Sequence, residues 1–354
     1  MRNLRLIGVL LLLWLPLKGF AVEVKADAPK TYVVVKGDTL WDIAGMFLDK
    51  PWLWPELWRN NTDISNPHLI YPGDVLRLIF DEEGEPQIVV ERAPEKPFVK
   101  LTPQGRIEQK ARPIDVLPFD VIRPYIENAA IMDESEYEAL PYLLGNHEGI
   151  ERFVSGVHVL GKASRSGETR FDVIRQQNVV RDREGNKLGI QVRHISEAVA
   201  TDDDLDKQQL VKIVDGHIEA KRGDRLIPMQ EPEVQEMQLI GAVAQRGFLV
   251  DSLEQHGLLG KFDIVVIDLG KGDVMPGTVM GVYNQGPNIV DGKQPKYANE
   301  DNALRSAFEW GDEIVQPSVK VGELVVFKTF DKASYALLTK ASNFIRVGAI
   351  VARP

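Results

Sequence analysis

The chain has 354 residues, more than one compact core usually holds, and this length predicts two or three domains. Its 42 Lys and Arg residues against 52 Asp and Glu residues give a net charge of −10, which disfavours nucleic acid and anionic membrane surfaces as partners. The absence of cysteine excludes disulfides, thiolate metal sites, cysteine nucleophiles and a lipoprotein anchor on an acylated cysteine.

Residues 1–21 have the pattern of a secretory signal peptide. Arg2 and Arg5 form a basic start, Leu6 to Leu15 form an apolar core, and Gly19-Phe20-Ala21 supply small residues for cleavage. An uncleaved anchor helix is the alternative, but the apolar run is shorter than the roughly 20 residues that span a bilayer. We therefore expect an exported protein, located in the periplasm of a diderm bacterium.

A small module with the order strand, helix, helix, strand is predicted over residues 31–80. The β-branched run Tyr32 to Val35 predicts the first strand, and Gly37 provides the turn after it. Thr39, with Asp42 three residues later, has the spacing of a helix-capping box. The helix that follows has one apolar face, formed by Leu40, Ile43, Ala44 and Phe47.

The second half of this module is rich in tryptophan. The stretch PWLWPELWRNN predicts a second helix with Pro55 in its first turn, and Val75 to Phe80 predict the second strand. We expect Trp52, Trp54 and Trp58 to pack in the core, because a fully buried large apolar side chain contributes about 1.5–3 kcal/mol. A sugar-stacking platform is the alternative role for these three residues.

Residues 81–146 are predicted to be a proline-rich linker followed by a small connecting subdomain. Asp81 to Pro97 combine proline with charge, as is typical of a semi-rigid linker. Pro113 to Leu144 contain more apolar residues, interrupted by proline, with a short helix expected within Glu134 to Leu144.

From residue 147 to residue 354 the pattern is mainly β and predicts a barrel or sandwich, as one domain or two subdomains. The strands are expected at Val154–Leu160, Phe171–Ile174, Gly189–His194, Leu210–Ile213, Glu236–Ala244, Phe262–Leu269, Thr278–Tyr283, Gly322–Phe330 and Ser334–Thr339. The fold class predicted for the whole chain is therefore α+β.

Two further features stand out in this β-rich part. A turn of glycine followed by an acid recurs at Gly223-Asp224, Gly272-Asp273 and Gly322-Glu323, which indicates either repeated turn chemistry or a duplicated β unit. Residues 284–317 form a long polar insertion, for which we expect a role in binding a partner or in oligomer contacts.

No catalytic residue, metal site or cofactor is predicted. The sequence lacks a His-x-His pair, a G-x-S-x-G elbow and an S-x-x-K motif followed by S-x-N. His147 and His158 bracket Glu148 and Glu151 without the spacing of a zinc-binding motif. A non-enzymatic protein is therefore expected, with a wall-remodelling enzyme that uses an unfamiliar β-domain site as the alternative.

The stretches Lys36-Gly37-Asp38-Thr39-Leu40-Trp41 and Leu69-Ile70-Tyr71-Pro72-Gly73-Asp74 make the module resemble a LysM domain, which binds peptidoglycan or chitin. The resemblance implies a groove between two loops, where backbone amides read an N-acetyl group and Ile70 and Pro72 form an apolar dent. The implied glycan-binding residues are Gly37, Asp38, Thr39, Leu40, Leu69, Ile70, Tyr71, Pro72 and Gly73. The alternative is that these residues only determine the fold.

The chain as a whole, which ends in GELVVFKTFDKASYALLTKASNFIRVGAIV followed by ARP, resembles the type IV pilus secretin-associated proteins. Their carboxyl-terminal part is similar to the terminal domain of a flagellar ring protein. The resemblance implies a homo-oligomeric periplasmic ring in which LysM holds peptidoglycan and the remainder surrounds an outer-membrane secretin. A LysM accessory of another envelope complex is the alternative.

Overall fold

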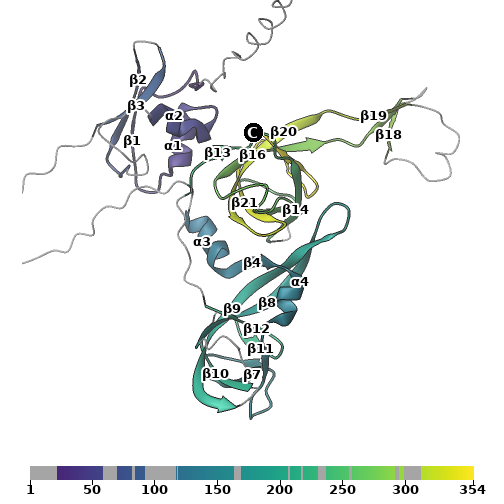
Figure 1. The fold of residues 1–354 in the computed structure, drawn as a ribbon. Helices are drawn as coiled ribbons and strands as arrows, with labels where there is room; N and C mark the ends of the chain where they lie inside the picture. Colours follow the sequence, from purple (N-terminus) through teal and green to yellow (C-terminus); the bar gives the residue numbers. More distant parts are fainter. Residues whose placement is uncertain are drawn as a thin grey trace, which may run out of the picture. The chain divides into compact units, whose positions relative to one another are not determined.

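The computed structural model describes residues 22–58, 70–81, 84–91, 117, 119–162, 169–205, 208–216, 218–229, 237–254, 257–291, 295–298 and 312–354 (Figure 1). The chain divides into two compact units, Met1–Leu117 and Pro118–Pro354. The predicted signal peptide and residues 92–116 of the predicted linker and connecting subdomain lie outside the described residues.

Helices in the described part of the chain are short. None of them combines the length and the apolar character that a membrane-spanning helix needs.

The first unit contains a three-stranded antiparallel sheet with the order β1-β2-β3 and two short α-helices. Its elements are β1 (Thr31–Val33), α1 (Leu40–Phe47), the 3₁₀ turn η1 (Pro51–Leu53), α2 (Trp54–Trp58), β2 (Val75–Phe80) and β3 (Pro86–Glu91). Thr39 is the N-cap of α1, and its hydroxyl accepts a hydrogen bond from the Asp42 backbone N–H at 3.1 Å. The capping prediction and the predicted apolar face of α1 are confirmed.

The core of the first unit is aromatic. Trp52, Trp54 and Trp58 are all buried, and the Trp54 ring lies 5.9 Å from the Trp58 ring and 6.3 Å from the Phe47 ring. These separations are those of packed aromatic pairs. The prediction that the tryptophans form the core is therefore confirmed.

Strand β3 occupies part of the stretch that was predicted to be a linker. It pairs with β2 along its whole length, and Ile88 at its centre is fully buried in the core. Its only proline, Pro86, is the first residue of an edge strand, where a missing N–H is tolerated. The proline and charged residues around the apolar run Ile88 to Val90 favoured the prediction of a linker over that of a strand.

The second unit begins with α3 (Phe119–Asn128) and continues into a seven-stranded sheet. The sheet has the order β12-β8-β9-β10-β7-β5, with β4 paired to β9. Its elements are β4 (Ala129–Met132), α4 (Glu134–Ala139), β5 (Leu143–Gly145), β7 (His158–Lys162), β8 (Arg170–Arg181), β9 (Lys187–Leu205), β10 (Gln208–Gly216) and β12 (Arg225–Pro228). A separate pair joins β6 (Arg152–Phe153) to β11 (Ala220–Lys221).

One predicted strand in this region is wrong over half of its length. Val154 to Val157 form a turn between β6 and β7, with Gly156 at φ +92° and a Val157-to-Val154 backbone hydrogen bond. Only residues 158–160 of the predicted strand belong to a strand, β7. Glycine at a positive φ explains why the chain reverses there.

The carboxyl-terminal sheet closes into a barrel, because β16 pairs with both β20 and β22. Its strands are β14 (Gly247–Ser252), β15 (Ile264–Ile267), β16 (Thr278–Gln285), β20 (Ser318–Thr329), β21 (Ser334–Ala341) and β22 (Ile350–Ala352), with β13 (Ile240–Gly241) parallel to β16. Aliphatic side chains such as Leu249, Val282 and Leu324 fill its interior. Closure leaves few open edges. The expectation of a mainly β carboxyl-terminal region is confirmed, with a barrel as its form.

The predicted insertion at 284–317 is partly regular. It contains β17 (Ile289–Asp291), β18 (Lys296–Tyr297) and β19 (Asp312–Ile314), which form a small sheet with the order β18-β17-β19. Figure 1 shows this β arm extending away from the barrel between β16 and β20. Residues 292–294 and 299–311 lie outside the described part.

The recurring turn of glycine and acid has two outcomes. Asp224 accepts from the Lys221 N–H at 2.7 Å, and Asp273 accepts from the Gly270 N–H at 3.1 Å, so both are turns. Gly322-Glu323 instead lies inside β20, and the buried Glu323 pairs with Lys320 at 2.6 Å. The third predicted turn is therefore wrong. The two genuine turns lie in different sheets, which favours repeated turn chemistry over duplication.

Lys328 of β20 joins the barrel to the end of α3. Its ammonium donates to the carbonyl oxygens of Ile126 at 2.6 Å and Ala129 at 2.8 Å. Ile126 lies in the last turn of α3, where carbonyls lack partners within the helix, and Ala129 is the first residue of β4, so the lysine bridges the end of α3 and the start of β4. Burial lowers the pKa of Lys328 from its ordinary 10.5 to about 8.

This pKa predicts how stability depends on pH. Between pH 8 and 10.5 the unfolded chain keeps a proton that folded Lys328 has released, so stability should rise with pH by about 3 kcal/mol over that window. Below pH 8 the cost of burying the charge is fully present. Urea unfolding from pH 7.5 to 10.5 should show a rise in the stability of the wild type that Lys328→Met lacks. Lys212→Met, an exposed lysine of β10, is the control, and parallel curves for the wild type and Lys328→Met would refute the assignment.

Candidate functional site

Two glycine turns meet beside the β1–β2 pair. The Val34 N–H donates to the Asp74 carbonyl at 2.9 Å, and the Gly73 N–H donates to the Val34 carbonyl at 2.8 Å. Val34 itself is buried in the core. The loop that follows β1 and the loop that precedes β2 are thus held together by their own backbones.

The first turn, Val35 to Asp38, is held by its aspartate. The Asp38 carboxylate accepts from the Val35 N–H at 2.9 Å and from the Tyr32 hydroxyl at 2.8 Å. Gly37 has φ +102°, a conformation that glycine adopts without strain. Burial, followed by the hydrogen bond to Asp38, raises the pKa of Tyr32. The Asp38 oxygen that makes these bonds therefore shapes the loop.

The second turn, Tyr71 to Asp74, is built in the same way. The Asp74 carboxylate accepts from the Tyr71 N–H at 3.0 Å, and the Asp74 N–H donates back to the Tyr71 carbonyl at 3.0 Å. Gly73 has φ +100°. Tyr32 and Asp74 position the two loops, yet neither was among the predicted site residues. The repeated Gly-Asp pair in the sequence was the signal for Asp74.

The backbone at the two glycines is open. Gly37 and Gly73 are exposed, and a Cβ added to either would meet no atom within 4 Å. Tyr71 and Pro72 are partly exposed next to Gly73. A ligand can therefore approach the main chain of both turns without displacing a side chain.

Other predicted site residues face the core. The side chains of Thr39, Leu40 and Ile70 are buried, so Ile70 does not line an open dent as was expected. Leu69 lies outside the described residues. Val35, which the resemblance did not indicate, is 53% exposed beside the first turn, and the predicted Pro72 is partly exposed beside the second.

The chemistry of this site is that of neutral hydrogen bonding. The described part of the chain holds no group of three or more His, Asp or Glu residues placed to bind a metal ion. Exposed backbone amides at tight turns supply donors and acceptors without charge, and Val35 and Pro72 supply apolar contact. Such an arrangement suits a ligand that carries amide and hydroxyl groups, as amino sugars do.

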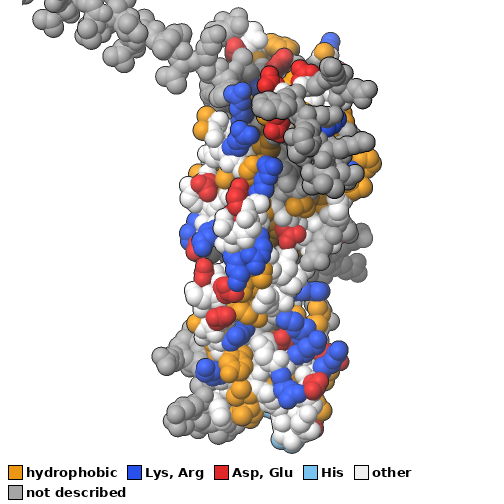
Figure 2. All heavy atoms as spheres, turned by 90° about the vertical axis from the view of Figure 1, so that its right-hand side faces the viewer, with side chains coloured by type: hydrophobic (Ala, Val, Ile, Leu, Met, Phe, Trp, Pro, Cys, Tyr) orange, Lys and Arg blue, Asp and Glu red, His pale blue; other side chains and the backbone are white. Residues whose placement is uncertain are grey.

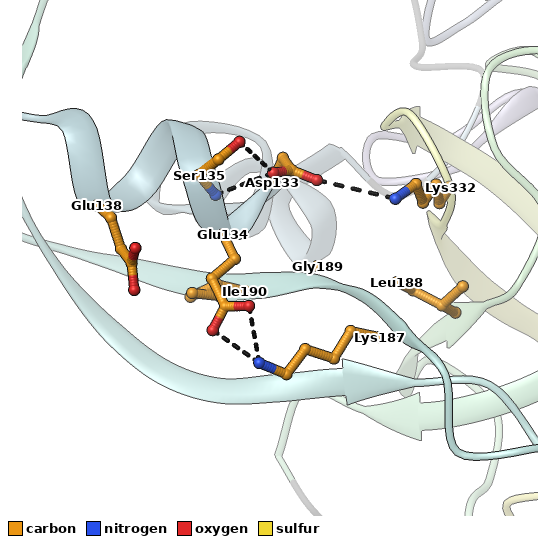
Figure 3. Close-up of a pocket in the computed structure, with 9 residues that line it drawn as sticks. All are labelled: Asp133, Glu134, Ser135, Glu138, Lys187, Leu188, Gly189, Ile190 and Lys332. Carbon is orange, nitrogen blue, oxygen red and sulfur yellow. Dashed lines mark hydrogen bonds and ion pairs between the residues drawn. The ribbon is translucent and has the colours of Figure 1, made fainter.

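A hollow in the second unit is the competing candidate (Figure 3). It has a volume of about 430 Å³ and is lined by Asp133, Glu134, Ser135, Glu138, Lys187, Leu188, Gly189, Ile190 and Lys332. Glu134 receives two hydrogen bonds of 2.7 Å from Lys187, and Asp133 receives bonds from Ser135 and lies 3.8 Å from Lys332. The Ser135 bonds lower the pKa of Asp133. Two of its three acids thus form ion pairs that join α4, β9 and the β20–β21 turn, which favours a structural role.

Figure 2 shows a surface of mixed charge. Basic and acidic side chains are interspersed over the face that it shows, with small apolar groups between them. Neither this face nor the hollow offers an extended field of one charge for a polyanionic ligand.

Comparison with known proteins identifies the first of the two candidates. Residues 32–78 match the family model of the LysM domain. The chain is also similar to the uncharacterised protein YqbP of Bacillus subtilis (strain 168), with 43% identity over 62 residues. That match covers 15% of this chain and 28% of YqbP. The chain therefore contains a LysM domain, a binding module for peptidoglycan or related carbohydrate, and the two open turns lie within it.

Removing the Asp74 carboxylate tests the second turn. Asp74→Ala leaves the Tyr71 N–H without this charged partner and should destabilise the LysM domain by about 1–3 kcal/mol. Four of the six tryptophans lie at positions 41 to 58, so urea unfolding followed by tryptophan fluorescence reports on this domain. Asp74→Asn, which keeps an acceptor oxygen, should lose less stability than Asp74→Ala. An unfolding curve of Asp74→Ala that overlays the wild type would contradict the role of this carboxylate.

Proposed function

We propose that this chain is a non-catalytic, peptidoglycan-binding periplasmic protein that holds the outer-membrane secretin of a type IV pilus system to the cell wall. The observation that carries the wall-binding part is the LysM domain with two open glycine turns joined through Val34. The predicted leader at residues 1–21 supports export, and the resemblance of the whole chain supports the secretin as partner and a homo-oligomeric ring.

The proposed recognition is that of an acetamido sugar by backbone. The N-acetyl group of a glycan offers one N–H, one carbonyl and a methyl group. Exposed backbone groups at Gly37 and Gly73 would form hydrogen bonds with the N–H and the carbonyl of the N-acetyl group. Val35 and Pro72 would contact its methyl group. Tyr32 and Asp74 act indirectly by fixing the loops. Asp38 has the same positioning role.

The affinity of one such site is expected to be low. A few hydrogen bonds contribute about 0.5–1.5 kcal/mol each, set against several kcal/mol for association, so micromolar to millimolar binding is expected. A ring of several copies would bind the wall far more tightly through effective concentration. An oligomer is therefore the form in which this domain makes a useful anchor.

Asparagine at the two open glycines tests glycan binding without breaking the turns. Asparagine tolerates positive φ at this position of a turn and would place a side chain in the open space. Gly37→Asn/Gly73→Asn should fold but lose sedimentation with purified sacculi. Gly84→Asn is the matched control, since Gly84 also has a positive φ of +84° and open space but lies in the β2–β3 turn. Equal sedimentation of the double variant and the wild type would contradict the site.

The partner is tested by purification from solubilised membranes of the native host. The full-length protein should retain the secretin, and the Gly37→Asn/Gly73→Asn variant should retain it equally, because the proposed contact lies in the second unit. Recovery of another envelope complex without secretin would favour the alternative of a different machine. Release of muropeptides from sacculi by the purified protein would instead favour a wall-remodelling enzyme.

A further inference from the structure

The β arm, formed by β17, β18 and β19, carries an apolar row on one of its faces. The register places Ile289 of the central strand opposite Tyr297 on one side and Ile314 on the other. Residues that are directly paired project from the same face of a sheet. Tyr297 is 45% exposed and Ile314 is 48% exposed, so the row is open to solvent at both edges of the arm.

Hydrogen bonds hold the arm in shape. The Asn288 side chain donates to the Glu313 carboxylate at 2.7 Å, and the Gln316 side chain donates to the Pro287 carbonyl at 2.6 Å. These bonds join the two strands that connect the arm to the barrel. A small sheet is stable when an apolar face packs against another layer. The exposed row therefore indicates a surface that waits for such a layer.

Two acids on the same face as this row define the charge of the missing layer. Asp291 of β17 is directly opposite Asp312 of β19, two positions from Ile289 and Ile314. Like charges directly opposite each other destabilise a sheet. By the same register Lys296 lies on the other face of the arm. The arm therefore suits a partner that combines a cation with apolar side chains, and it disfavours an anionic membrane and a second arm alike.

One end of the barrel has a surface of this kind. It consists of the connections at residues 257–263 and 342–348, which we call the aromatic end. The Leu259 N–H donates to the Ile345 carbonyl at 3.0 Å, and the Ile345 N–H donates back at 3.3 Å. Both side chains are buried in the barrel core. The aromatic end is thus a fixed platform.

Exposed rings and cations alternate on the aromatic end. Phe262 is 40% exposed and Phe344 is 66% exposed. The Lys261 ammonium lies 4.4 Å from the centre of the Phe262 ring. Arg346 is exposed two positions after Phe344. A group of exposed apolar side chains with polar residues among it is typical of an interaction surface.

Two acids lie close to these cations in the sequence, and both make hydrogen bonds within the chain. The Asp263 carboxylate closes its own turn by accepting from the Gly260 N–H at 2.8 Å. The Glu254 carboxylate accepts from the Tyr125 hydroxyl of α3 at 3.0 Å. The aromatic end is therefore not a field of one charge, and its match to the arm is a local one.

Phe262 has a backbone conformation that its side chain does not favour. At the equivalent position of other turns this chain has Gly37, Gly73 or Gly223, whereas Phe262 is at φ +75°. A bulky residue in this conformation is strained, so folding alone would favour glycine. An exposed and strained ring is better explained by a contact outside the chain.

The arm leaves the barrel next to the aromatic end without covering it. The Asn284 side chain, just before the arm, donates to the Phe344 carbonyl at 2.9 Å. Figure 1 shows the arm extending away from the barrel, and the exposure of Phe262 and Phe344 is that of uncovered rings. The aromatic end of each chain is therefore open to the arm of another.

We propose that the β arm of one copy of this chain binds the aromatic end of a second copy. The apolar row would pack on Phe262 and Phe344, while Arg346 would bind Asp291 and Asp312. Each surface has a feature that folding alone disfavours, and each supplies what the other needs. A second copy is the favoured partner because every chain carries both surfaces in equal number.

The contact joins two different surfaces, so it is a head-to-tail contact. Such a contact lets each copy bind two neighbours and closes into a ring when the rotation allows. The inference rests on the oligomer of the proposed function and names the contact that forms it.

Two variants, each defective in one surface, test the proposal by analytical ultracentrifugation of the purified protein. The arm variant is Asp312→Lys/Ile314→Ser, and the end variant is Phe262→Gly/Arg346→Glu. The wild type should self-associate, and each variant alone should associate about tenfold or more weakly. An equal mixture of the two variants should form a heterodimer, because it unites an intact arm with an intact aromatic end.

The folding of the variants is measured separately by thermal unfolding. Asp312→Lys removes the opposition of two acids and Phe262→Gly removes a strained φ, so each single variant should melt at the same or a higher temperature than the wild type. Lys212→Glu/Met275→Ser is the control, since both side chains are exposed, on β10 and at the opposite end of the barrel. It should associate as the wild type does.

Three results would overturn the proposal. A wild type that stays monomeric at every concentration refutes the contact and the oligomer together. An arm variant or end variant that associates as tightly as the wild type refutes the contact and leaves the oligomer in place. A mixture that associates no better than its components shows that arm and end do not bind each other. None of these readouts depends on sacculi or on the secretin, so failure here is distinguishable from failure of wall binding.

Discussion

The carboxylate that closes a four-residue turn is the interaction on which the binding site of this protein depends. At Asp38 and again at Asp74, a side-chain oxygen accepts the N–H of the residue three positions earlier. That bond lets the turn close without help from a ligand, while the glycine before each aspartate exposes its backbone. A site made of main chain needs such support, because exposed amides have no side chain to orient them.

The same construction recurs where no sugar is expected. Asp224, Asp263 and Asp273 close turns in the second unit with carboxylate bonds of 2.7 to 3.1 Å. At Asp224 the carboxylate also forms a two-bond ion pair with Arg175 and is almost fully buried. The turn is therefore a general means of reversing this chain. What distinguishes the LysM pair is that two such turns are joined through the backbone of Val34, since Gly223 and Gly272 are equally open.

The difference between a local turn and the pairing of two distant turns also explains which features could be predicted from the sequence. Local rules predicted the Thr39 cap, the apolar face of α1 and the Gly-Asp turns, because each depends on residues within a few positions of one another. They missed β3, since its pairing with β2 is set by a partner across a turn and not by its own proline-rich surroundings. The LysM resemblance implied that Ile70 lines an apolar dent, although the packing of the whole module buries it.

The closure of the barrel likewise could not be predicted from local patterns. Apolar runs predicted β15, β16, β20 and β21, but closure depends on the pairing of β16 with β22, which lie about 70 residues apart. The strand pairs that bring residues 257–263 beside residues 340–348 are equally distant in sequence. No local pattern predicts that Leu259 and Ile345 exchange backbone hydrogen bonds across this end of the barrel.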